Sequence, residues 1–187
     1  MAEALVLFGN EEYGATERAL QDLLGAFPDD AYARHVLGFT QTDDGRPSDA
    51  VATLESLLRD RPDYAAARNH LGYALLALGE TDAALEAMAQ FVAQSPGNYS
   101  AHDSYAEVLA ATGNVDAAIG RLTRAVLMEP RFAYGWRHMG DLLKEAGAQE
   151  AALAAYARAE AASTTYGPSF RESLAERRSE IREVESQ

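Results

Sequence analysis

Large apolar and small residues recur along this chain in a pattern with a period of 34 residues. One set of large residues comprises Leu37, Leu71, Tyr105 and Met139, and each is followed directly by Gly38, Gly72, Ala106 or Gly140. Further along each period lie the small residues Ala50, Ala84, Ala118 and Ala152 and the larger residues Leu54, Met88, Leu122 and Tyr156. Small residues let two helix backbones approach, and large ones fill the space beside the contact. The pattern therefore predicts pairs of antiparallel helices that cross at these positions.

Glycine and proline mark the ends of the predicted helices with the same period. The glycines are Gly45, Gly79, Gly113 and Gly147, and the prolines are Pro28, Pro62, Pro96 and Pro130. Glycine adopts the left-handed conformation that stops a helix without a Cβ penalty. In the first full period we expect one helix to end near Gly45. A second helix should begin at Pro47, whose missing N–H is harmless in a first turn, and end near Arg61, before Pro62.

This arrangement resembles the tetratricopeptide repeat, and the resemblance covers residues 31 to about 166. The period from residue 65 to 98 carries the signature residues Leu71, Gly72, Leu75, Gly79, Ala84, Met88 and Pro96. The period from residue 133 carries Trp136, Met139, Gly140, Leu143, Gly147, Ala152, Tyr156 and Ala159. Departures from the signature are Gln41, Phe91 and Thr164. The resemblance implies an all-α, right-handed superhelical solenoid of antiparallel helix pairs, in which Trp136 has a structural role in the core.

The period divides the chain into full repeats at residues 31–64, 65–98, 99–132 and 133–166. Residues 1–30 form a degenerate repeat, in which a first helix would be cut to residues 3–8 and a second would contain Tyr13, Leu20 and Leu23. Residues 167–187 are expected to form a C-terminal capping helix. Its apolar stripe is Phe170, Leu174, Ile181 and Val184, interrupted by Arg177. The alternative is a dimerising coiled coil, but fewer than three heptads are present, which favours a cap.

Composition narrows the classes of partner. The net charge of −13 is spread along the chain and repels nucleic acid. No cysteine is present, so disulfides and thiolate metal sites are excluded. The apolar run from Ala4 to Phe8 is too short to span a membrane and lacks the basic flank of a secretory signal. We therefore expect a cytoplasmic protein without a membrane or nucleic-acid partner.

The family resemblance also implies where a partner would bind, because the first helix of each repeat lines the concave groove. By position, the groove would be lined by Tyr32, His35, Phe39, Asn69, His70, Tyr73, Asp103, Ser104, Glu107, Tyr134, Arg137, His138 and Asp141. Aromatic rings supply apolar area, while polar groups orient a peptide backbone, so this mixture favours a peptide or protein segment. The alternative is that these are merely solvated helix positions. His70 and Tyr73 are the residues for which binding is the favoured interpretation.

Other kinds of site find less support in the sequence. Some family members hold a chaperone's C-terminal carboxylate with lysine, asparagine and arginine, but the corresponding positions hold His35, Phe39, His70, Ser100 and Ser104, so this clamp is absent. The four histidines lie on different repeats without helical pairing, so we expect no metal or cofactor, and His102 should pack between helices. No catalytic motif is present, and Glu107 and Asp141 are interpreted as a solvated groove wall, so an enzyme is not expected.

Two functional hypotheses remain. The first is an adaptor that binds a peptide or protein segment in the groove. The second is a self-assembling structural protein that forms a homodimer through its terminal helices, since the run from Ala4 to Phe8 and the stripe of the last helix could each be covered by a second copy. The fold alone does not choose between them.

Overall fold

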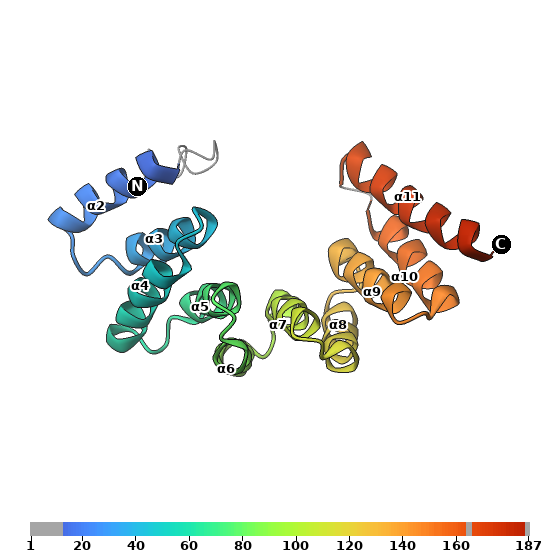
Figure 1. The fold of residues 1–187 in the computed structure, drawn as a ribbon, viewed down its shortest axis with the longest axis horizontal. Coiled ribbons are helices and arrows are strands. Elements are labelled where there is room, and N and C mark those ends of the chain that lie inside the picture. Colours follow the sequence, from blue (N-terminus) through green and yellow to red (C-terminus); the bar gives the residue numbers. More distant parts are fainter. Residues whose placement is uncertain (1–12, 164–165, 186–187) are drawn as a thin grey trace. The chain divides into compact units, whose positions relative to one another are not determined.

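The computed structural model describes residues 13–163 and 166–185, and within these ranges the chain forms helices and no strands (Figure 1). The helices are α2 (Tyr13–Ala26), α3 (Ala31–Asp43), α4 (Pro47–Asp60), α5 (Ala65–Ala77), α6 (Thr81–Gln94), α7 (Tyr99–Ala111), α8 (Val115–Met128), α9 (Ala133–Glu145), α10 (Gln149–Ala162) and α11 (Pro168–Glu185). The all-α prediction is confirmed. The predicted short helix at residues 3–8 and Thr164 lie outside the described residues.

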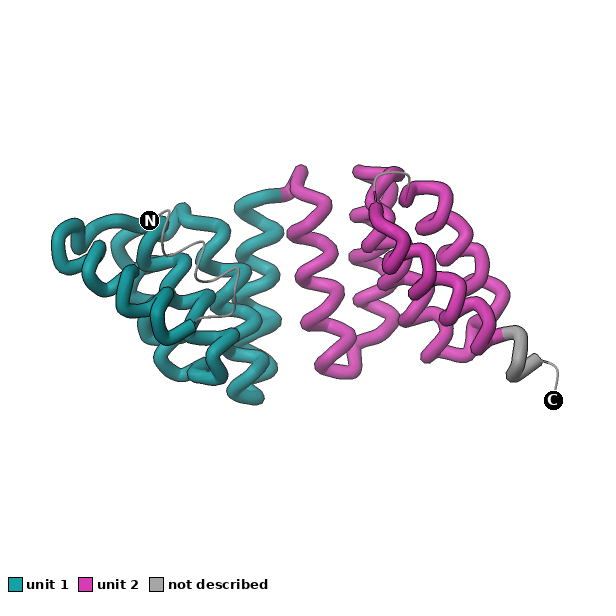
Figure 2. The backbone as a smooth tube through the Cα atoms, turned by 90° about the horizontal axis from the view of Figure 1, so that it is seen from above, with its two compact units in different colours: residues 1–95 teal, residues 96–187 magenta. Residues whose placement is uncertain are grey.

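The chain divides into two compact units, residues 1–95 and 96–187 (Figure 2). In the first unit α3 pairs with α4 and α5 with α6, while α2 packs on α3 and α4 on α5. In the second unit α7 pairs with α8 and α9 with α10, while α8 packs on α9 and α11 on α10. Each predicted helix pair is therefore present. The boundaries of the repeats stay our proposed division of the chain.

The turn inside each helix pair depends on a glycine in the left-handed conformation. Gly45, Gly79, Gly113 and Gly147 have φ angles of 74°, 77°, 81° and 77°. After α5, the N–H of Gly79 donates to the carbonyl of Leu76 at 2.9 Å and that of Glu80 to the carbonyl of Leu75 at 2.9 Å. These bonds satisfy carbonyls that the end of a helix would leave unpaired. The predicted bounds of α4 are also confirmed, since it begins at Pro47 and is capped by Arg61.

Two glycines of the second unit should respond oppositely to alanine. Gly113→Ala should lower the free energy of unfolding by about 1 kcal/mol, because a Cβ is strained at a φ of +81°. Gly120 lies within α8, is exposed, and has no atom within 4 Å of the place that a Cβ would occupy, so Gly120→Ala should raise stability by about 0.5–1 kcal/mol. Urea unfolding followed by circular dichroism measures both. If both variants change the free energy of unfolding in the same direction, this account of the turn is contradicted.

The predicted helix crossings are confirmed by how closely the small residues approach the large ones. A Cβ at Gly38 would lie 2.5 Å from Cγ of Leu54, and one at Gly140 would lie 2.4 Å from Cε1 of Tyr156. At Gly72 the nearest atom is the flexible Cε of Met88, at 2.8 Å. Since Leu54, Met88, Leu122 and Tyr156 are all fully buried, each crossing is the core of its own helix pair.

One departure from the repeat signature is explained by a polar network between α2, α3 and α4. Gln41 is buried, and its side-chain carbonyl accepts a hydrogen bond from Oγ1 of Thr53 at 2.9 Å. Its amide donates to Glu17 of α2 at 3.5 Å, and Glu17 also forms an ion pair with Arg46. Buried polar groups need partners of this kind. Gln41 therefore stands where the signature has an apolar residue because its hydrogen bonds link the degenerate first repeat to the next helix pair.

The last helix covers the end of the second unit. Phe170, Leu174 and Ile181 of α11 are buried in one core with Tyr156 and Ala159 of α10. Arg177, which interrupts the stripe, donates from Nε to Oδ1 of Asp141 at 2.7 Å, so it joins α11 to α9. The cap interpretation is confirmed for these residues. The side chain of Val184 lies outside the described residues.

Two further residues have the structural roles expected of them. His102 is 1% exposed and packs inside its helix pair, as predicted. Trp136 packs against the same core as α11, and its Nε1 donates to the carbonyl of Pro130 at 3.0 Å. Both side chains therefore contribute to packing within their helix pairs.

Candidate functional site

In the first unit, α3 and α5 bring aromatic and imidazole rings together. The ring centroids of His35 and His70 are 4.6 Å apart, and those of Phe39 and His70 are 4.5 Å apart, both with the rings edge to face. His35 also lies 5.5 Å from Tyr64 and 6.2 Å from Tyr32. We call these five residues the ring cluster. Edge-to-face contacts of this kind are favourable, so the rings support one another.

The two histidines of the ring cluster are neutral near pH 7. Burial, and then the charge of His35, lower the pKa of His70 to about 4. Burial also lowers the pKa of His35, whose two ring nitrogens are buried without hydrogen-bond partners. Desolvation disfavours the charged form of an imidazole. The ring cluster is therefore an uncharged surface at neutral pH, and Tyr32 is its well-exposed member, at 47%.

From the sequence, binding is the favoured interpretation for His70 and Tyr73, and it stays a prediction; the structure shows that the His70 side chain is half-buried. Its ring is held between His35 and Phe39, so it contributes to packing as well as to surface. Asn69 and Tyr73 are half-buried on the same helix. Tyr64 was missed, although an aromatic residue directly before a helix, where a polar cap is usual, was a signal that could have found it.

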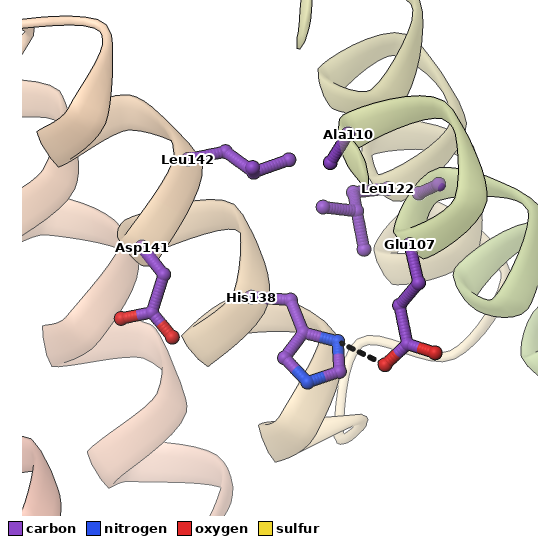
Figure 3. A pocket seen from close by; sticks show the side chains of 7 residues that line it. Glu107, Ala110, Leu122, His138, Asp141 and Leu142 are labelled. Atoms are coloured by element: carbon purple, nitrogen blue, oxygen red, sulfur yellow. Dashed lines mark ion pairs between the residues drawn. The ribbon is translucent and has the colours of Figure 1, made fainter. Parts of the chain in front are cut away.

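In the second unit, α7 and α9 bring together two carboxylates and an imidazole. Nδ1 of His138 lies 2.9 Å from Oδ1 of Asp103 and 3.7 Å from Oε1 of Glu107. Asp103 and Glu107 are one helical turn apart on α7 and so share a face. Figure 3 shows the His138 ring turned toward the Glu107 carboxylate. We call Asp103, Glu107 and His138 the carboxylate–imidazole cluster.

The charge of His138 reflects competing influences. Burial alone would lower its pKa, but the hydrogen bond with Asp103 and the charges of Asp103 and Glu107 outweigh burial and raise the pKa above its ordinary value. Arg137 opposes this rise, with Nη2 at 3.2 Å from Nε2 of His138. The Arg137 guanidinium also lies over the ring of Tyr134, 4.9 Å from its centroid.

A pocket of about 230 Å³ adjoins this cluster. It is lined by Ala106, Glu107, Ala110, Leu122, His138, Asp141 and Leu142, of which four are apolar (Figure 3). Glu107 and Asp141 lie on opposite sides of the His138 ring. Asp141 is also bound within the protein, because its Oδ1 accepts hydrogen bonds from Oη of Tyr156 at 2.8 Å and from Arg177. The pocket thus combines an apolar lining with acidic groups.

The structure places the predicted groove residues in two separate groups, one in each unit. Tyr32, His35, Phe39 and His70 are joined in the ring cluster, with Asn69 and Tyr73 on the same helix. Glu107, His138 and Asp141 line the second-unit pocket, and Asp103 is hydrogen-bonded to His138, while Ser104 is a half-buried neighbour on α7. Tyr134 is 38% exposed and contacts Phe170 of α11. The apolar lining from Ala110, Leu122 and Leu142 was not predicted.

The paired helices, the left-handed glycines and the small-residue crossings define a helical repeat protein. Sequence models of the tetratricopeptide repeat match residues 42–99 and 75–142, and together they span 42–142. The chain belongs to the tetratricopeptide repeat family. Proteins of this family generally act as scaffolds that bind other proteins. None of the curated protein sequences matches the chain significantly.

Solved structures of tetratricopeptide repeat proteins have the same fold. A thermophilic member from Thermus thermophilus, TTC0263, gives a TM-score of 0.81 at 22% identity, over 95% of this chain and 96% of its own. A member from Parabacteroides merdae gives 0.76 at 14% identity, over 95% and 68%. The protein MamA gives 0.69 at 23% identity, over 87% and 95%. Among the described residues, no helix has the length and apolar character needed to cross a membrane.

Proposed function

We propose that this protein is an interaction scaffold that binds a peptide or protein segment through the first helices of its helix pairs. The observation that carries the proposal is the second-unit pocket, where apolar side chains and acidic groups from α7, α8 and α9 lie together. Shallow pockets beside polar groups are typical of sites that accept one anchoring side chain of a partner. The ring cluster of the first unit supplies a second, uncharged contact surface.

The chemistry of the pocket favours a segment that is both basic and apolar. Leu142 and Ala110, which are half-buried, would contact the aliphatic part of a lysine or arginine side chain, which buries its stem while keeping its charged end near water. Glu107, an exposed member of the lining, would meet the positive end. The net charge of −13 would attract such a segment over longer distances.

Selection from a random peptide library tests this proposal. The immobilised protein, with a chelator present to remove metals, should enrich peptides in which a lysine or arginine is flanked by apolar residues. Glu107→Arg should lose these peptides, since it places a like charge at the rim, and the Glu107 side chain that it replaces is exposed. The binding constant of one enriched peptide, measured by fluorescence anisotropy, should weaken about tenfold or more.

A matched control makes the same charge change elsewhere. Glu86 is exposed on α6, a second helix of its pair, so Glu86→Arg should retain the enriched peptides. Retention by Glu107→Arg as well would contradict a site in the pocket. Enrichment of acidic peptides, or of none, would contradict the proposed partner chemistry.

A homodimer through the terminal helices is the less favoured alternative. The stripe on α11 that suggested it is buried against α10 at Phe170, Leu174 and Ile181. The run from Ala4 to Phe8 lies outside the described residues. We therefore base no function on self-assembly, and no catalytic step belongs to the proposal.

A further inference from the structure

The carboxylate–imidazole cluster has the composition of a metal site. It offers one imidazole nitrogen and two carboxylate oxygens, and the three ligand atoms lie within 4.8 Å of one another. The set therefore mixes nitrogen with oxygen, which suits zinc and similar divalent transition metals better than magnesium or calcium. We propose that Asp103, Glu107 and His138 bind a divalent transition metal ion such as Zn²⁺.

The two distances from the His138 nitrogen to the carboxylates are close to what such an ion requires. Zinc bonds to nitrogen and oxygen are about 2.0–2.2 Å long, so ligand atoms around a tetrahedral ion are about 3.4 Å apart. The distances from Nδ1 of His138 are 2.9 Å to Asp103 and 3.7 Å to Glu107, one shorter and one longer than that value. Small side-chain rotations would make the two distances equal. The exposed Glu107 side chain can make the larger rotation.

The backbone already holds the ligands in place. Asp103 and Glu107 are fixed one turn apart by α7, and α9 carries His138 across from them within the same compact unit. A metal that binds three protein groups keeps a further position open. The adjoining pocket shares Glu107 and His138 with the cluster, so it leaves space for water or for an oxygen of a bound ligand at that position.

Arg137 is the feature that limits this site. When Nδ1 binds a metal, the imidazole proton moves to Nε2, which then donates and no longer accepts. The Arg137 guanidinium, 3.2 Å from Nε2, can only donate, so it must move away on metal binding. Its positive charge also opposes a cation. Arg137→Gln would remove that charge and offer a side-chain carbonyl to Nε2–H, and should strengthen metal binding.

Zinc titration followed by NMR of the histidine rings tests the inference. The chain has four histidines, so the ring spectrum of tag-free, metal-free protein is simple. At pH 7.5, Zn²⁺ alone should shift the His138 ring signals and leave those of His35, His70 and His102 in place, with one ion bound in the micromolar range. His138→Gln and Glu107→Gln should each weaken binding about tenfold or more, and Arg137→Gln should tighten it. Mg²⁺ should cause no shift.

His35→Gln is the matched control, because it removes a histidine from the other unit and should leave zinc affinity unchanged. Shifts of other histidines, binding unaffected by His138→Gln, or no shift up to millimolar Zn²⁺ would overturn the proposal. If His138→Gln does not fold, Glu107→Gln decides, since its side chain is exposed. The titration contains no peptide and the peptide selection contains no metal, so either proposal can fail without the other.

Discussion

Tyr156→Ala is expected to lower the free energy of unfolding by about 3–5 kcal/mol, the range for truncating a fully buried aromatic residue. The ring fills the crossing of α9 and α10, where a Cβ at Gly140 would lie 2.4 Å from it, and it also packs in the core shared with α11. Its removal leaves a cavity that Gly140 has no side chain to fill. Urea unfolding followed by the fluorescence of Trp136, the single tryptophan, reports on this part of the chain.

Tyr156→Phe separates packing from hydrogen bonding. It keeps the ring and removes only the hydroxyl group that donates to Asp141, so the cost should be about 1 kcal/mol. If alanine and phenylalanine cost the same, the hydrogen bond and not the packing at the crossing would be the main contribution of Tyr156.

The second large effect concerns pH and the ring cluster. We expect the free energy of unfolding to fall by about 2 kcal/mol between pH 7 and pH 5 through His70 alone. The pKa of His70 is about 4 in the folded state, against an ordinary value of 6.5. Between these values the unfolded chain binds a proton that the folded chain does not, so stability is lost as the pH falls. Urea unfolding at the two pH values measures the loss.

His70→Phe removes this titration while keeping a ring between His35 and Phe39. Between pH 7 and pH 5, the variant should therefore lose about 2 kcal/mol less of its free energy of unfolding than the wild-type protein loses. The comparison cancels the contribution of carboxylates, which both proteins share, and of His35, whose lowered pKa acts in the same direction. An unchanged pH dependence in His70→Phe would show that His70 titrates normally.

Local rules made most of the fold predictable from sequence. A helix end needs a left-handed residue, and Gly45, Gly79, Gly113 and Gly147 satisfied that need at one fixed period. The small residue at each crossing is likewise demanded by its bulky neighbour, as Gly38 is by Leu54. The division into two compact units was not predicted, because it depends on packing between repeats and the period is the same on both sides.

The site was predicted less completely, because side-chain direction is not visible in a repeat pattern. Asp103 and His138 are 35 residues apart, one more than the period, and only the packing of α7 beside α9 brings them within 2.9 Å. The spacing of the histidines alone gives no sign of this mixed cluster. Glu107 and Asp141 were interpreted as a solvated groove wall; both line the pocket, but the bonds of Asp141 to Tyr156 and Arg177 could not be foreseen.

Asp141 belongs at once to the pocket lining and to the anchor of α11, through Arg177. The two roles are thermodynamically linked. A cationic ligand that attracts the Asp141 carboxylate competes with Arg177. The binding free energy of the ligand is therefore reduced by the free energy that the Asp141–Arg177 interaction contributes. By reciprocity, the same ligand loosens the last helix by an equal amount. Local unfolding of α11 would then release Asp141 from Arg177 and raise the affinity of the pocket for a positively charged ligand.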